Sequence, residues 1–227
     1  MEGVWIIMAS INGITVKGLK QFVGHEGEPL FQGNLYLNGK KIGFWSQGDW
    51  GGPDRFQLDG GWQQEKTLDE AVKAMYPERA HHGVSHGGEP YVVEYGLEFL
   101  MTDILDLIQD EKKFKGAVKN GYAGILVATD GFHETVWSLP AAYTALSNEA
   151  LLAKMDGVLK KTMESFFPED EYRRHQVKVY RNLKDFDVGE PLLLVEKSLD
   201  TVVRDAAKRS EKGSRDQVPE TKEDIDK

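Results

Sequence analysis

The pair Asn38-Gly39 constrains the fold of this chain more than any other feature of its 227 residues. Both residue types adopt a positive φ at low energetic cost, and a type I′ hairpin turn needs a positive φ at both central positions. Two segments that suit strands flank the pair, at 30–37 before it and at 40–46 after it. Strand-like segments joined by Asn-Gly predict an antiparallel hairpin here.

Further strands extend this hairpin into a sheet. An alternating segment at 14–23 precedes it, and a glycine loop at 48–53 leads to a fourth strand at 55–58. Asp59-Gly60-Gly61 then interrupts the pattern, because glycine weakens a strand interior. We therefore expect residues 11–60 to form an antiparallel meander.

The remainder, residues 61–203, is predicted to be rich in helices. Apolar residues recur at helical spacing between Leu97 and Lys119, and Asn120-Gly121 provides a C-cap signal. Thr67 and Glu70 have the spacing of a capping box, which predicts a helix start at 67. The full set of expected elements is helices at 67–75, 97–119, 148–166 and 198–209, a loop at 77–90, and strands at 124–129, 135–139 and 176–180. A sheet followed by helices and a few further strands is the α+β pattern.

Composition excludes several classes of protein. The chain has no Cys, which removes disulfides, cysteine-ligated zinc, iron–sulfur clusters and thiol catalysis. It carries 28 Lys and Arg against 37 Asp and Glu, a net charge of −9, which argues against direct binding of a nucleic-acid backbone. No stretch approaches the roughly 20 apolar residues of a membrane span.

The expected organisation is a single domain at 10–203, between an N-terminal extension at 1–9 and a C-terminal region at 204–227. This last region is predicted to hold the end of a helix and a disordered polar tail, because almost no apolar residues follow Gly213. Either Met1 or Met8 suits a natural start, and the first residues lack the basic region of a signal peptide. We expect a cytoplasmic protein that is not bound to a membrane, and the sequence leaves open whether it forms a homo-oligomer.

Two motifs resemble a known family. The segment Phe31-Gln-Gly-Asn-Leu-Tyr-Leu-Asn-Gly-Lys-Lys-Ile-Gly43 and the following Gly48-Asp-Trp-Gly-Gly-Pro-Asp-Arg-Phe56 are similar to a hairpin and a Gly-Gly loop of an uncharacterised family of small phage and bacterial proteins. An acidic helix, an apolar strand and a late strand ending in Tyr180-Arg-Asn-Leu183 occupy similar places. The resemblance implies an accessory protein of a phage or mobile element, and it implies no catalytic residues.

The glycine loop is the predicted ligand site. Its glycines let a ligand approach the backbone, its indoles offer stacking faces, and its arginine suits a phosphate. These properties fit a small nucleotide or a contact surface for a protein, although tryptophans of a glycine-rich turn also pack into cores. The predicted site residues are Trp45, Asp49, Trp50, Gly51, Gly52 and Arg55.

From these features we expect a non-enzymatic binding protein without a cofactor. It would bind a host protein or sequester a small nucleotide, and so inhibit a host defence pathway. The resemblance, the lack of any catalytic signature and the aromatic glycine loop motivate this expectation.

A metal-assisted hydrolase is the first alternative. The loop His81-His82-Gly-Val-Ser-His86, with Glu89, contains ligand types that bind transition metals, although the spacing matches no zinc signature and also suits structural histidines. Two other clusters suit proton transfer, and the second also suits a metal, but ordinary turns fit both clusters better. They are Asp130, His133 and Glu134, and the group His25, Glu26 and Glu28.

A DNA mimic is the second alternative. The predicted helix at 97–119 carries Glu98, Asp103, Asp106, Asp110 and Glu111, and more acids lie at 164–171. Such acidic faces can dock on a basic enzyme, but they also occur as ordinary solvated helix faces.

Overall fold

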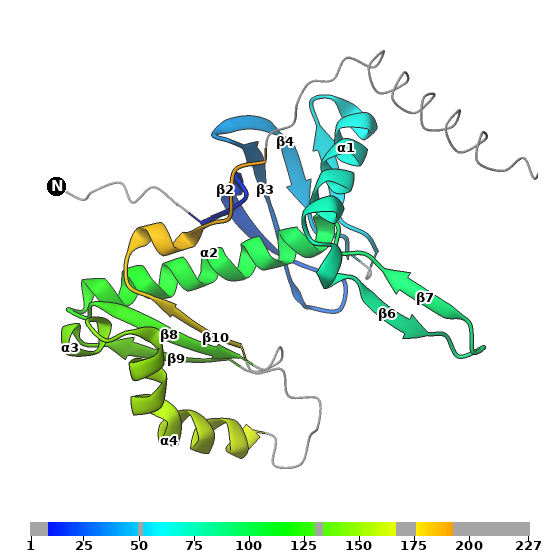
Figure 1. Cartoon of the computed structure of the whole chain (residues 1–227). Coiled ribbons are helices and arrows are strands. Elements are labelled where there is room, and N and C mark those ends of the chain that lie inside the picture. Colours follow the sequence, from blue (N-terminus) through cyan, green and yellow to red (C-terminus); the bar gives the residue numbers. More distant parts are fainter. Residues whose placement is uncertain (1–8, 50–51, 130–133, 167–175, 193–227) are drawn as a thin grey trace, which may run out of the picture. The chain divides into compact units, whose positions relative to one another are not determined.

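The N-terminal meander forms a six-stranded sheet in the computed structural model, which describes residues 9–49, 52–129, 134–166 and 176–192 (Figure 1). Neighbouring strands β1 to β5 are antiparallel, and β11 pairs in parallel with β1 at the edge of the sheet. In spatial order the strands are β11 (Asp187–Val188), β1 (Ser10–Ile11), β2 (Ile14–Val23), β3 (Pro29–Leu37), β4 (Lys40–Ser46) and β5 (Arg55–Leu58). The predicted meander is thus confirmed, and two short strands, β1 and β11, extend it beyond β2.

The turn between β3 and β4 has the conformation predicted for it. Asn38 and Gly39 have φ of 48° and 79°, as a type I′ turn requires. A second Asn-Gly pair joins β1 to β2, with φ of 52° at Asn12 and 76° at Gly13. The same local chemistry therefore sets two hairpins of this sheet.

Helix α1 (Gly61–Met75) begins six residues before the predicted start at Thr67. Thr67 lies inside the helix, where its hydroxyl donates a hydrogen bond to the carbonyl of Gln63 at 2.8 Å. The Gly60 N–H instead donates to Oε1 of Gln64 at 2.8 Å, which satisfies a donor at the helix start. The capping-box interpretation was wrong because the helix begins at Gly61, and Gln64 accepts the hydrogen bond at its start.

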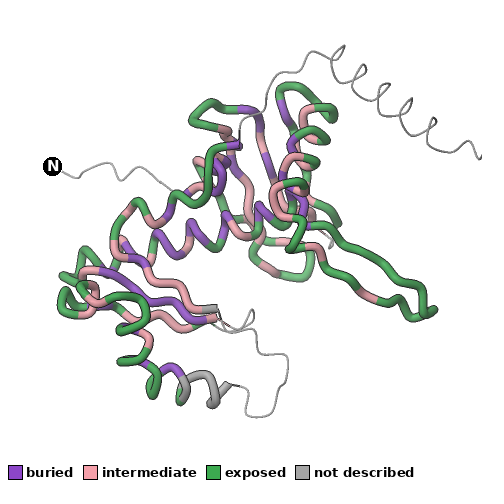
Figure 2. Tube along the Cα trace, viewed as in Figure 1, coloured by how far each residue is buried: buried purple, intermediate pink, exposed green. Residues whose placement is uncertain are grey.

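The loop predicted at 77–90 was also wrong. A short 3₁₀ helix, η2 (Pro77–Arg79), is followed by a two-stranded ribbon of β6 (His81–Val84) and β7 (Pro90–Val93). Every position of the ribbon strands is exposed except Gly83, which is half-buried (Figure 2). Without a buried face, the segment lacks the alternating pattern that would have revealed its strands.

Helix α2 (Leu97–Lys119) confirms its prediction and packs against both larger sheets. It contacts β1 of the six-stranded sheet and β8 of a three-stranded sheet. Its fully buried residues follow helical spacing, at Leu100, Met101, Ile104 and Ile108.

The three-stranded sheet is covered on two faces, with β8 (Gly124–Thr129) between β9 (Glu134–Leu139) and β10 (Gln176–Tyr180). Leu126 and Ala128 pack in one cluster with Leu151 and Met155 of α4 (Asn148–Phe166). The alternate residues of β8 point to the other face, where α2 packs. A short helix, α3 (Ala141–Thr144), follows β9, and η3 (Leu183–Phe186) leads into β11. These elements complete the α+β fold.

All the described residues belong to one compact unit that ends at Leu192. The predicted helix at 198–209 and the predicted polar tail lie outside the described residues. None of the described helices is both long and apolar enough to cross a membrane.

Candidate functional site

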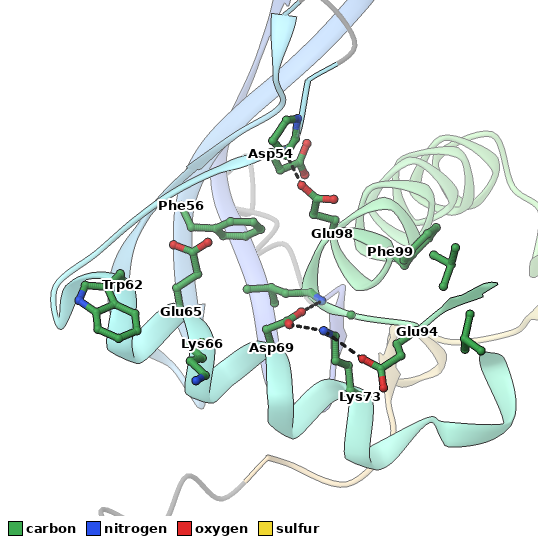
Figure 3. Close-up of a pocket in the computed structure, with 15 residues that line it drawn as sticks. Asp54, Phe56, Trp62, Glu65, Lys66, Asp69, Lys73, Glu94, Glu98 and Phe99 are labelled. Atoms are coloured by element: carbon green, nitrogen blue, oxygen red, sulfur yellow. Dashed lines mark hydrogen bonds and ion pairs between the residues drawn. The ribbon is translucent and has the colours of Figure 1, made fainter. Parts of the chain in front are cut away.

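An open cleft of about 1130 Å³ lies where α1, α2, β5 and the end of β7 meet (Figure 3). Helix α1 forms one wall, the first turn of α2 supplies Leu97, Glu98 and Phe99, and β7 contributes the apolar Val92 and Val93. The segment before β5 supplies Pro53 and Asp54. The cleft therefore combines residues from four separate parts of the chain.

Helix α1 presents one complete side to this cleft. Its lining residues are Trp62, Glu65, Lys66, Asp69 and Lys73. These positions are separated by three, four, seven and eleven residues from the first, the spacing of one helix face. Leu68 and Val72 lie on the other side and are buried, so α1 has one face in the core and one in the cleft.

Asp69 fixes α1 against the start of α2. Its Oδ1 accepts the backbone N–H of Leu97 at 2.7 Å, and its Oδ2 lies 2.9 Å from Nζ of Lys73. Lys73 also lies 3.2 Å from Oε2 of Glu94. The hydrogen bonds that Lys73 donates to Asp69 and to Glu94 raise the pKa of Lys73 despite its partial burial. The lysine is therefore held in its charged form between two carboxylates.

Asp54 connects the cleft to the hydrophobic core behind it. The indole Nε1–H of Trp45 donates to Oδ2 of Asp54 at 2.7 Å, and the Asp54 backbone N–H donates to Oε1 of Glu98 at 2.6 Å. Burial raises the pKa of the Asp54 carboxyl, the hydrogen bond from Trp45 opposes this shift, and the charge of Glu98 adds to it. Asp54 therefore takes up a proton at a higher pH than an ordinary aspartate does.

Exposed apolar side chains line the same cleft. Trp62 is 70% exposed, Val92 54% and Phe99 47%. Large exposed apolar side chains that line one cleft are a common feature of interaction surfaces. Figure 3 shows Trp62 and Phe56 towards one end of the cleft, and Phe99 at the other end.

The cleft is also acidic. Five carboxylates line it against two lysines, a net charge of −3 when all are ionised. Both lysines already have carboxylate partners. Nζ of Lys66 lies 3.7 Å from Oε1 of Glu70, and Lys73 is paired with Asp69. The five acids are Asp54, Glu65, Asp69, Glu94 and Glu98. Such a site attracts positive charge and repels anions.

The predicted loop residues are not assembled as one surface. Trp45 is fully buried, 0% exposed, and reaches the cleft through Asp54. Asp49 and Arg55 form an exposed ion pair at 3.3 Å, and neither lines the cleft. Gly52 is exposed, while Trp50 and Gly51 lie outside the described residues.

The histidines proposed as metal ligands are not brought together. His81 and His82 are consecutive on β6, so their side chains point to opposite faces, and His86 lies in the turn beyond the strand. Among the described residues no group of three or more His, Asp or Glu is placed to hold a metal ion. His81 and His82 instead line a second hollow, of about 680 Å³, with Arg79 and Asp103.

The acids of α2 do not form a continuous exposed face. Asp110 and Glu111 are each 1% exposed. Asp110 accepts the Tyr180 hydroxyl at 3.0 Å, and Glu111 accepts the backbone N–H of Ala9 at 3.0 Å. These two carboxylates therefore hold parts of the fold together, which the interpretations as a solvated face or a DNA mimic did not anticipate.

The two proposed proton-transfer clusters also have local partners. Glu134 bonds to Lys113, while Asp130 and His133 lie outside the described residues. Glu28 accepts the backbone N–H of Glu26 at 2.8 Å, as expected for a turn. The acids near 164–171 are not described.

Sequence reasoning missed most of the residues that line the cleft. Trp62, Glu65 and Lys66 lie before the predicted helix start at 67, so their helical spacing with Asp69 went unrecognised. A helix started at Gly61 would have placed them on one face with Asp69 and Lys73.

Comparisons of the chain with protein-family models, with curated proteins and with solved structures give no match.

Proposed function

We propose that this chain is a non-enzymatic binding protein whose cleft receives a basic and apolar segment of a partner protein. The observation that carries the proposal is the combination of exposed apolar side chains with a net charge of −3 in one cleft. Aromatic groups provide contact area, and carboxylates select for Lys or Arg on the partner.

The charge of the cleft favours a protein segment over a nucleotide. A phosphate would lie among carboxylates such as Glu94 and Glu98, and both lysines already have acidic partners. Arg55, the residue expected to meet a phosphate, is paired with Asp49 and does not line the cleft. Of the two ligands considered from the sequence, the protein partner therefore has the stronger support.

The resemblance adds a biological context to this proposal. It suggests that the partner is a host protein, that the chain belongs to a phage or mobile element, and that binding inhibits a host defence pathway in the cytoplasm. These statements stay predictions, and the cleft supports the binding role alone.

Isothermal titration with synthetic peptides tests the binding role. We expect a peptide in which Arg alternates with Val to bind, and we expect its counterpart with Glu in place of Arg to release no heat. Equal binding of both peptides, or binding of neither, would overturn the proposal. A nucleotide panel is titrated in parallel, and binding of a nucleotide in the cleft would replace the protein partner.

Two matched pairs of variants locate the binding in the cleft. Trp62→Ala should weaken peptide binding by about tenfold, since tryptophan is enriched among the interface residues whose truncation costs more than about 1 kcal/mol. Tyr122→Ala, which removes another exposed aromatic outside the cleft lining, should have no effect. Glu98→Gln should weaken binding by removing a charge, whereas Glu149→Gln, in the first turn of α4, should not. Similar losses in both members of a pair would place the peptide elsewhere.

A further inference from the structure

Strand β7 has an unpaired edge within the described part of the chain. It pairs with β6 in a two-stranded ribbon, and no other described strand joins them. Exposed strand edges invite pairing with another chain, and native proteins usually block or cover them. This edge is therefore a site at which a partner strand can add.

The register of the ribbon shows which backbone groups face that edge. Ser85 and Glu89 extend the register of the ladder, and the Ser85 N–H donates to the Glu89 carbonyl at 2.8 Å. Hydrogen-bonded and non-hydrogen-bonded pairs alternate along an antiparallel ladder. His82 and Val92 therefore form a non-hydrogen-bonded pair, which directs the N–H and C=O of Val92 away from β6 and those of His82 away from β7.

The unpaired edge of β7 lies on the side of the acidic cleft. Among the described residues that line the cleft, β7 contributes Val92 and Val93, and β6 contributes none. The second hollow is lined instead by His81 and His82 of β6. The two strands of the ribbon thus line different hollows, which share Phe99 of α2, and a strand paired with β7 would lie along the cleft wall.

We propose that the partner segment binds as an added β-strand along β7, anchored at Val92. Backbone hydrogen bonds would provide the pairing, and side chains would provide the specificity, as in other cases of strand addition. The segment this edge fits is extended, with Lys or Arg to meet Glu94 and Glu98 and with apolar residues to cover the exposed Val92 and Phe99. This inference rests on the proposed function and adds the mode of binding to it.

The unpaired edge of β7 is short and offers a partner strand few backbone groups. Pro90 begins β7 and has no N–H, so it offers the partner a carbonyl alone. Val92 offers both a donor and an acceptor. Indiscriminate pairing is thereby restricted, because side-chain contacts in the cleft must supplement a few backbone bonds.

A pair of proline variants tests the mode of binding. Val92→Pro removes the N–H that faces the cleft, and His82→Pro removes the equivalent N–H on the opposite edge. Neither substitution removes a hydrogen bond between β6 and β7, so both should leave the ribbon paired. We expect Val92→Pro to weaken binding of the alternating Arg-Val peptide about tenfold, while His82→Pro changes it less than about twofold.

Amide hydrogen exchange provides a second measurement in the unmodified protein. Exchange of the Val92 amide should slow when the peptide binds, because its N–H gains an acceptor, while the His82 amide should be unaffected. If the peptide binds but both proline variants bind it normally and the Val92 amide is unprotected, strand addition is wrong and the acidic cleft remains the site. If no peptide binds the unmodified protein, the proposed function itself has failed.

Discussion

Trp45 and Asp54 act as a unit in which a core residue supports a cleft residue. The indole is fully buried, and its N–H is bonded to a carboxylate that lies partly in the cleft. Hydrogen bonds to charged groups contribute more than neutral ones, and a carboxylate in partial burial depends on such donors. The same bond therefore affects both stability and the charge of the site.

The first prediction concerns this bond. Trp45→Phe should lower the free energy of unfolding by about 2–3 kcal/mol, because it removes the N–H donor and leaves a small void. Trp62→Phe, which changes an exposed indole, should alter stability by less than about 0.5 kcal/mol. Urea denaturation measures both values. Equal changes in the free energy of unfolding would show that the bond between Trp45 and Asp54 does not stabilise the fold.

The second prediction concerns pH. Burial raises the pKa of Asp54, so this carboxyl takes up a proton at a higher pH than an ordinary aspartate does. Because a basic peptide prefers the ionised form, its affinity should fall as the pH drops through this raised pKa. In Asp54→Asn the affinity should be lower at neutral pH, and its decline should begin at a lower pH. Titration calorimetry between about pH 4 and pH 8 tests this, and parallel declines in both proteins would contradict it.

At the scale of elements, local signals predicted most of the fold. The Asn38-Gly39 turn, the strand at 124–129 and the helix at 97–119 each have a pattern contained within one segment. The ribbon and the start of α1 were not predicted. The ribbon has no buried face and so no alternating pattern, and the start of α1 depends on the side chain of Gln64. The cleft itself combines residues from β5, α1, β7 and α2. A single sequence does not indicate which of its segments meet in space.

The third prediction compares two glycines that differ in the space available for a side chain. Gly43, on β4, has a φ of 155°, and a Cβ there would overlap the Gln57 carbonyl oxygen and Leu58 Cα of β5. Gly116 is exposed on α2, and a Cβ there would meet no atom within 4 Å. We expect Gly43→Ala to lower the free energy of unfolding by at least about 2 kcal/mol and Gly116→Ala to raise it by about 1 kcal/mol. Thermal and urea unfolding measure both, and a stable Gly43→Ala variant would show that β5 moves freely away from β4.

At the scale of the whole molecule, α2 joins the two larger sheets through contacts with β1 and β8. The chain then returns to the first sheet, since β11 pairs with β1 after the second sheet is complete. Buried carboxylates reinforce these junctions, with Glu111 bonded to Ala9 and Asp110 bonded to Tyr180 on β10. Helix α2 therefore packs against both sheets, while α4 covers the other face of the second sheet.

The fourth prediction follows from this shared helix. Ile104 is fully buried on α2, and Ile104→Ala should lower the free energy of unfolding by about 2–4 kcal/mol. Because both sheets pack against α2, hydrogen exchange of the most protected amides should accelerate by the same factor in β3 and in β8. Val118→Ala, at an exposed position of α2, provides the control and should change neither. Acceleration confined to one sheet would show that the two sheets unfold separately, and α2 would then stabilise one sheet without coupling it to the other.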